Sequence, residues 1–240
     1  MSNYDSFREQ FSLIEKALRK LNNEPTGSTA SFGLLLDRTV EKSKLVRSLY
    51  DELRIFVDIR NILEHNIDSR KAIEIPESTV IRIKKVYETL TNPPNVLEFI
   101  NRGVSYCQKT DQIDVVLKTM VDNDFSQVPV LDKETFYGLL TTNTIARWLG
   151  KELLDFEMVI SETNVDKVMQ HSENLKNYKF VSRKANLFEI VEIFAKETES
   201  KGFFDAILIS ETGKENQKIL GIITKSDLPD IILSTKRQTF

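Results

Sequence analysis

Two side chains suited to proton transfer and anion binding stand close together in the stretch Asp58–Asn66. Arg60 carries a planar fork of donors that can hold an anion. His65, one of two histidines in the chain, can take or return a proton near neutral pH. No Pro or Gly occurs from Leu34 to about Asn66, so the stretch is expected to be helical. At 3.6 residues per turn, Arg60 and His65 then point roughly 140° apart, so one helix does not present them as a tight pair.

The same residues also suit an ordinary surface helix. Arg60 and Glu64 have the spacing of an ion pair, which is worth less than about 1 kcal/mol. His65 would lie near a helix C-terminus, where the helix dipole favours a cation. Asn61 and His65, four residues apart, do share a face. A catalytic interpretation therefore requires a homodimer through the helix that bears Arg60, so that side chains from two helices meet in one cleft.

Composition limits the remaining chemistry. The 240 residues carry a net charge of −3, with 40% hydrophobic and 29% charged residues, which indicates a globular protein without an overall attraction for nucleic acid. A single cysteine, Cys107, suits a reducing cytosol, and one Cys with two distant His argues against a zinc site. The chain shows no signal-peptide pattern and no apolar run of membrane-spanning length. We therefore expect a cytoplasmic protein with no metal, no required cofactor and no membrane partner.

The first third of the chain has the apolar spacing of helices. The first stripe consists of Phe7, Phe11, Ile14, Leu18 and Leu21. One long helix or two abutting helices are expected from Leu34 to about Asn66, and another begins after Pro76. The run TNPPN ends that helix, because proline cannot donate a backbone hydrogen bond. We place a domain boundary there, with a helical domain over residues 1–92.

The rest of the chain, residues 96–240, repeats one pattern. A helical stripe, an apolar strand, a turn and a glycine-led strand that enters a helix occur twice in that order. The first copy comprises Ile113–Met120, Val128–Leu131 and Gly138–Thr144. The second comprises Leu187–Phe194, Ala206–Ile209 and Gly221–Leu228. We predict two β-α-β-β-α units that pack against each other, since neither can bury its sheet alone. With the helical domain, the predicted fold class is α+β.

The glycine-led run of the second copy can be compared with a known family. Gly221–Leu228 has the pattern Gly-h-h-Thr-x-x-Asp-h, in which h is apolar, and resembles a CBS domain. The repeat as a whole resembles a tandem CBS pair, or Bateman module, with units at about 96–155 and about 160–240. Val165–Met169 is similar to the V-x-x-V-M run that opens a second CBS unit. The resemblance implies a sensor that binds adenine nucleotides in clefts between the two units.

The resemblance also assigns roles in the second unit. Thr224 matches the hydroxyl position, and Asp227 matches the carboxylate that accepts from both ribose hydroxyls. Backbone amides at the start of the following helix would meet phosphate, and Lys225 is a further candidate for that contact. The alternative is that Thr224 and Asp227 only form the strand end and cap of an ordinary turn.

The first unit departs from the family pattern. Thr144 stands where the aspartate is expected, which predicts a degenerate half-site. The run Gly138–Ile145, which includes Thr141, nevertheless resembles the first unit of small bacterial CBS proteins that bind cyclic di-AMP. Arg147 suits the phosphates of such a ligand, although it also suits a solvated surface.

The helical domain has a resemblance of its own. Arg60, Asn61 and His65 match the HEPN signature of an arginine, a polar neighbour and a histidine, and the similarity covers about residues 2–90. HEPN nucleases cleave RNA without metal from a cleft between two chains. The resemblance implies that His65 would act on the 2′-hydroxyl and Arg60 on the scissile phosphate. Many HEPN domains keep the fold and the dimer without catalysis.

The sequence thus predicts a cytoplasmic regulatory protein. Its CBS pair would sense AMP, ATP or cyclic di-AMP and control a dimeric helical effector domain. The alternative is a metal-independent HEPN endoribonuclease gated by the CBS pair, with RNA as its substrate. A second alternative is a non-catalytic dimeric scaffold.

Overall fold

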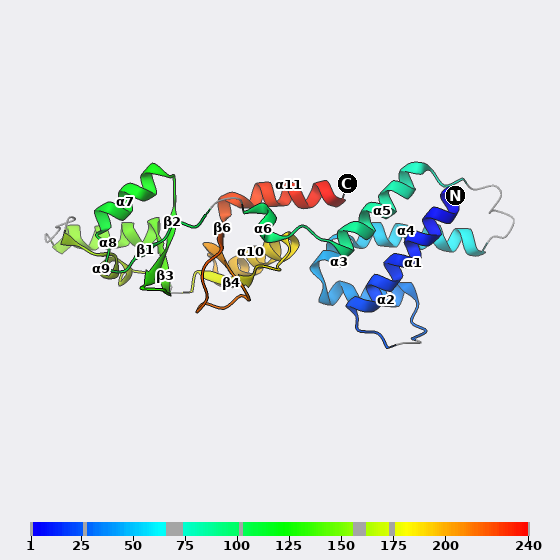
Figure 1. The fold of residues 1–240 in the computed structure, drawn as a ribbon, viewed down its shortest axis with the longest axis horizontal. Coiled ribbons are helices and arrows are strands. Elements are labelled where there is room, and N and C mark those ends of the chain that lie inside the picture. The colour runs from blue at the N-terminus through cyan, green and yellow to red at the C-terminus, as the bar shows by residue number, and fades with distance from the viewer. Residues whose placement is uncertain are drawn as a thin grey trace. The chain divides into compact units, whose positions relative to one another are not determined.

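The computed structural model describes residues 2–25, 28–65, 74–100, 103–155, 162–172 and 176–239 of the chain (Figure 1). The chain divides into two compact units. We call the first the helical unit; it comprises Met1–Pro94, Asn186–Ile193 and Leu228–Phe240. We call the second the αβ unit; it comprises Asn95–Ala185 and Phe194–Asp227. The predicted boundary at residues 92 to 96 falls between helix α5, which ends at Thr91, and helix α6, which begins at Val96.

Serine side chains begin three of the helices in the first third of the chain. The helices are α1 (Asn3–Leu21), α2 (Phe32–Lys42), α3 (Lys44–Ser48), α4 (Tyr50–His65) and α5 (Glu77–Thr91). Ser2 and Asp5 form a capping box, and the hydroxyls of Ser31 and Ser43 accept from amides of the turns that follow them. The segment from Leu34 was expected to hold one or two helices, and it holds three. Ser43 is extended and caps a new helix, an interruption that needs neither Pro nor Gly.

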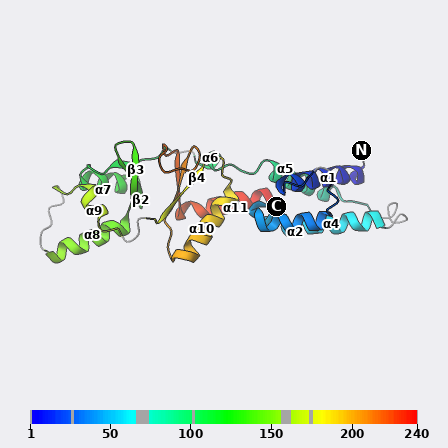
Figure 2. The same ribbon diagram turned by 90° about the horizontal axis from the view of Figure 1, so that it is seen from below.

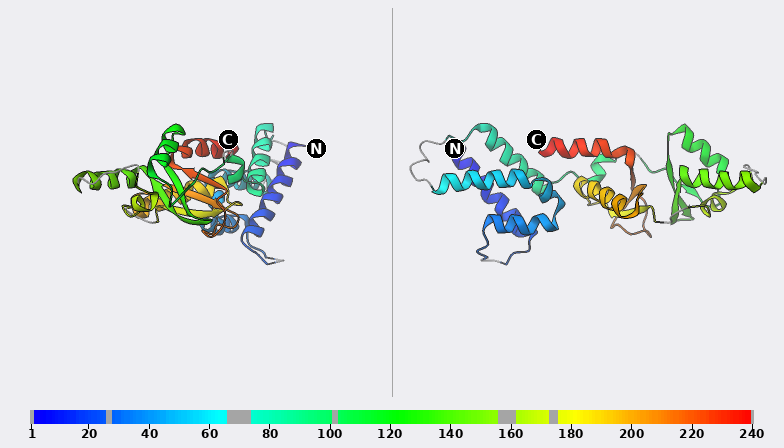
Figure 3. Two further views of the ribbon diagram at one scale, coloured as in Figure 1. Left: turned by 60° about the vertical axis from the view of Figure 1, so that its left-hand side comes forward. Right: turned by 180° about the vertical axis from the view of Figure 1, so that it is seen from behind.

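Aromatic rings fill much of the core of the helical unit. Phe11 stacks on Phe32 with ring centroids 4.5 Å apart, and Phe7 meets Phe56 edge to face at 6.1 Å. Helices α1 and α5 lie side by side (Figure 3). The buried Glu52 of α4 accepts from Arg82 of α5, and this bond raises the pKa of the Arg82 guanidinium. The helix that carries Arg60 is therefore fixed by apolar packing and by one partly buried ion pair.

The predicted repeat of helix and strand is confirmed. The first copy contains α6 (Val96–Phe99), β1 (Cys107–Gln108), α7 (Ile113–Asp122), β2 (Gln127–Asp132), β3 (Thr135–Thr141) and α8 (Thr142–Asp155). The second contains α9 (Val165–Met169), β4 (Tyr178–Ser182), α10 (Leu187–Lys201), β5 (Ala206–Ser210), β6 (Gly221–Thr224) and α11 (Leu228–Thr239). Each sheet has one parallel and one antiparallel pair, in the orders β1-β2-β3 and β4-β5-β6. Helices α7, α8 and α9 lie around the first sheet (Figure 2). Strand β3 begins three residues before Gly138, where the sequence pattern had placed its start.

Each repeat binds the short opening helix of the other one. The amide of Val165, at the start of α9, donates to Asp111 of the first repeat at 2.9 Å. The amide of Val96, at the start of α6, donates to Ala185 of the second repeat at 2.9 Å. The same exchange occurs at the two glycine-led strands, since Gly138 faces Met169 and Gly221 faces Ile100. The internal repeat thus extends from the sequence pattern to the hydrogen bonds.

Alanine at Gly221 is expected to lower the free energy of unfolding by about 1–3 kcal/mol, the usual range for overpacking, and alanine at Gly138 by less. A Cβ at residue 221 would lie 2.7 Å from Ile100 Cδ1 and 3.1 Å from Ile209 Cδ1, in stiff β-branched side chains. At residue 138 the close atom is the end of the flexible Met169 side chain, at 2.7 Å. Urea unfolding of the two variants measures the difference, and an equal or larger loss for Gly138→Ala would contradict this account.

Candidate functional site

The turn between β6 and α11 holds a carboxylate in a defined position. Strand β6 ends at Thr224, and Lys225–Asp227 forms a single 3₁₀ turn before α11. Asp227 Oδ2 accepts from the Thr224 amide at 2.7 Å and from the Thr224 hydroxyl at 3.0 Å. Because the Thr224 hydroxyl donates to Asp227, the Ser226 hydroxyl 2.7 Å away must donate to Thr224. The amide and hydroxyl of Thr224 therefore fix the carboxylate, and the Ser226 hydroxyl orients the Thr224 hydroxyl.

This geometry leaves acceptor capacity on Asp227. Both of its bonds use Oδ2, and within the described residues no donor reaches Oδ1. The side chain is half-buried, and its bonds run back to Thr224 rather than forward to the amides of α11. Asp227 thus closes the turn and can still accept hydrogen bonds from a ligand. Lys225 is exposed beside it.

The corresponding turn of the first repeat is closed by hydroxyls. Thr141 Oγ1 accepts from the Thr144 amide at 3.1 Å, and the two hydroxyls lie 3.1 Å apart. Both side chains are buried. Thr144 therefore preserves the turn without a charge, and no carboxylate stands there to recognise a ligand.

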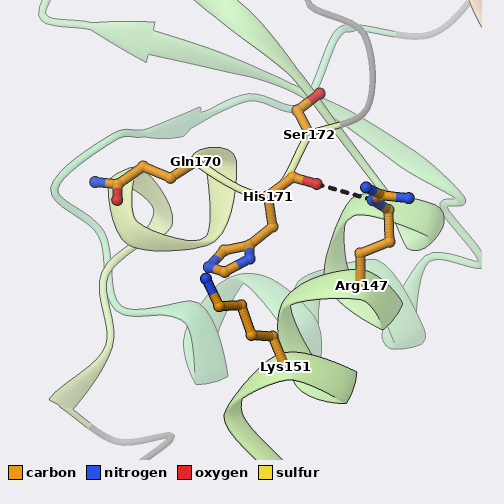
Figure 4. Close-up of a pocket in the computed structure, with 5 residues that line it drawn as sticks. All are labelled: Arg147, Lys151, Gln170, His171 and Ser172. Carbon is orange, nitrogen blue, oxygen red and sulfur yellow. Dashed lines mark hydrogen bonds between the residues drawn. The ribbon is translucent and has the colours of Figure 1, made fainter. Parts of the chain in front are cut away.

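A basic pocket of about 460 Å³ lies between α8 and the residues that follow α9 (Figure 4). Its lining consists of Arg147, Lys151, Gln170, His171 and Ser172. Arg147 and Lys151 project from one face of α8, and the Lys151 amine ends beside the His171 ring. Arg147 Nε donates to the His171 carbonyl at 3.1 Å, which fixes the guanidinium at the pocket. No carboxylate of the described residues lines the pocket, so the chemistry of this lining is that of an anion site.

The docking of α9 on α8 assembles this pocket. Lys167 of α9 and the buried Glu152 of α8 form an ion pair at 3.0 Å. This contact brings the segment after Met169 against α8. Sequence reasoning found Arg147 and missed the other four lining residues. The four-residue spacing of Arg147 and Lys151, which places them on one helix face, was the available signal.

The family model of the CBS domain matches the two repeats, at residues 96–151 and 165–234. The chain belongs to the CBS domain family. The predicted CBS pair is thereby confirmed, with Thr224 and Asp227 at the end of the glycine-led strand of the second CBS unit. No curated protein sequence matches the chain.

Solved structures with CBS domains are similar to the chain. CBSX2 in complex with AMP has 16% identity and a TM-score of 0.43, over 60% of this chain and 99% of that one. CbpB in complex with c-di-AMP has 19% identity and a TM-score of 0.45, and the match covers 64% of this chain and 93% of that one. The CBS domain of a CBS-domain-containing membrane protein from Sphaerobacter thermophilus has 17% identity and a TM-score of 0.41, and the match covers 57% of this chain and 87% of that one. These likenesses identify no ligand for this chain.

The Arg60 motif of the helical unit forms a local ion-pair cluster. Arg60 pairs with Glu64 at 2.9 Å and donates to Asn61 Oδ1 at 3.2 Å, and Arg8 of α1 lies 4.0 Å from Glu64. The expected surface pair of Arg60 and Glu64 is therefore present. The His65 side chain lies outside the described residues. The HEPN interpretation, RNA cleavage and pairing of two chains through α4 stay predictions.

Other candidate chemistry is limited within the described residues. They contain no group of three or more His, Cys, Asp or Glu that could hold a metal. No helix formed by them is long and apolar enough to cross a bilayer. Cys107 is buried, and burial, together with the charge of Asp111, raises the pKa of its thiol to about 12. A thiol held protonated in this way is a poor nucleophile.

Proposed function

We propose that this protein is a nucleotide-responsive regulator, in which the CBS pair binds an adenine nucleotide and the helical unit is the effector. The ordered carboxylate of Asp227 carries the proposal. It is fixed by Thr224 and keeps one oxygen for a ligand, which is the arrangement that recognition of ribose hydroxyls requires. The absence of a carboxylate at Thr144 points to the second CBS unit as the ribose-binding one.

The basic pocket supplies the second half of the proposal. Arg147, Lys151 and His171 converge on a cavity that no acidic side chain of the described residues lines, and they supply the charged donors that favour phosphate binding. Ribose recognition and phosphate recognition come from separate sets of side chains. Ligands with more phosphate charge should therefore depend more strongly on the pocket. AMP, ATP and cyclic di-AMP all combine an adenosine with phosphate, and they are the ligands to compare.

Thermal unfolding with and without nucleotide tests the proposal. A ligand at 100 times its Kd stabilises the native state by about 2.7 kcal/mol, so at least one of AMP, ATP and cyclic di-AMP is expected to raise Tm by several degrees. GMP, GTP and cyclic di-GMP serve as matched controls with the same phosphates. The proposal fails if none of the adenine compounds shifts Tm, or if each guanine compound shifts it equally.

A further inference from the structure

The two long helices of the second CBS unit take part in the helical unit. Asn186–Ile193, which contains the first turns of α10, and Leu228–Phe240, which contains α11, group with Met1–Pro94. Phe188 of α10 is 7% exposed and belongs to the same apolar cluster as the phenylalanines of α1, α2 and α4. Helix α11 packs against α5. These two segments therefore contribute to the packing of the helical unit itself.

A partly buried ion pair reinforces this packing. Glu192 of α10 pairs with Lys44, the first residue of α3, and lies 4.0 Å from Arg47. The side chains of Glu192 and Lys44 are only 16% and 29% exposed, so water screens their attraction less than it screens a surface pair. The pair joins α10 to the short helix that begins at the Ser43 interruption.

Helix α11 connects this packing to the proposed ligand site. Its first residue, Leu228, directly follows Asp227. Its side chains Ile231 and Thr235 are buried. One end of α11 is therefore set by the turn that carries the carboxylate, and the helix packs on α5.

We infer that α10 and α11 transmit occupancy of the Asp227 turn to α3 and α5, and that the Glu192–Lys44 pair holds the part of this connection that joins α10 to α3. The inference rests on the proposed function, because it assigns the regulation of that same site. A ligand changes the helical unit only if it binds two arrangements of these helices with different affinity. A ligand that orders the Asp227 turn favours the arrangement in which α11 is docked on α5.

Hydrogen exchange of the full chain, with and without saturating AMP, tests the inference. In the wild type, AMP is expected to slow exchange several-fold both at residues 221–227 and in α3 and α5. In Glu192→Gln, the AMP effects at residues 221–227 and in α5 are retained and the effect in α3 is lost. Without ligand, this variant is also expected to exchange faster in α3 than the wild type.

Glu199→Gln is the matched control. Glu199 is an exposed carboxylate two turns after Glu192 on α10, so this variant loses the same charge without loss of the Lys44 contact and should behave as the wild type. Two results overturn the inference and leave the proposed function standing. One is AMP-induced protection confined to residues 221–227 in the wild type, and the other is an unchanged response in Glu192→Gln. Silence at residues 221–227 in the wild type with AMP, ATP and cyclic di-AMP alike overturns both.

Discussion

Asp227→Ala is expected to weaken the binding of AMP by about 100-fold or more. A hydrogen bond to a charged group contributes about 1.5–3 kcal/mol, and the carboxylate is proposed to accept from two ribose hydroxyls. A factor of ten in Kd corresponds to about 1.4 kcal/mol, so the loss of both bonds exceeds two such factors. Isothermal titration calorimetry with AMP measures the change.

Asp230→Ala is the control for this substitution. Asp230 is an exposed carboxylate in the first turn of α11, three residues after Asp227, and its loss changes the net charge equally. It is expected to bind AMP within about twofold of the wild type, because it forms none of the bonds of the turn. Thermal unfolding of both variants shows whether the turn survives.

A ligand lacking one hydroxyl separates ribose recognition from a general loss of binding. The wild type is expected to bind 2′-deoxy-AMP about tenfold more weakly than AMP, because the loss of one hydrogen bond to a charged group accounts for about that factor. Asp227→Ala should lose almost nothing further, because the partner of that hydroxyl is already absent. Equal discrimination against the deoxy ligand in both proteins would remove Asp227 from the ribose site.

Local patterns in the sequence were sufficient for the repeat and for the Asp227 turn. The glycine-led strand, the threonine and the aspartate lie within seven residues, and the turn that they form depends on bonds between neighbours, Thr224 to Asp227. The glycines are explained by contacts with the opening helices, at Met169 and Ile100. A pattern that recurs twice in the same order identifies such a unit without knowledge of the tertiary structure.

Features that depend on packing between distant segments were not visible in the sequence. The basic pocket combines residues of α8 with residues that follow α9, about twenty positions later in the sequence. Only the docking of α9 on α8 brings His171 to Arg147. The interruption at Ser43 is set by one hydroxyl cap, which the apolar spacing does not reveal. The association of Phe188 with the helical core is a tertiary contact of a helix that the sequence assigned only to the second repeat.

Arg147→Ala combined with Lys151→Ala is expected to weaken AMP binding by about 30- to 100-fold and to leave adenosine binding unchanged. The two side chains supply charged donors to a phosphate, and each such bond is worth about 1.5–3 kcal/mol when formed; part of the Lys151 contribution is lost to solvent at its exposed position. Calorimetry with AMP and adenosine on the same protein gives the two affinities directly.

The comparison of the two ligands distinguishes phosphate contact from a structural role. Arg147 also donates to the His171 carbonyl at 3.1 Å, so its loss can loosen the segment after α9. A loosened segment would weaken adenosine and AMP alike, whereas a lost phosphate contact weakens AMP alone. Lys118→Ala, an exposed lysine of α7 outside the pocket, removes one charge from the same repeat and controls for long-range electrostatics. Because a charged contact is screened by salt, the ratio of AMP to adenosine affinity should also fall with ionic strength in the wild type and much less in the double variant.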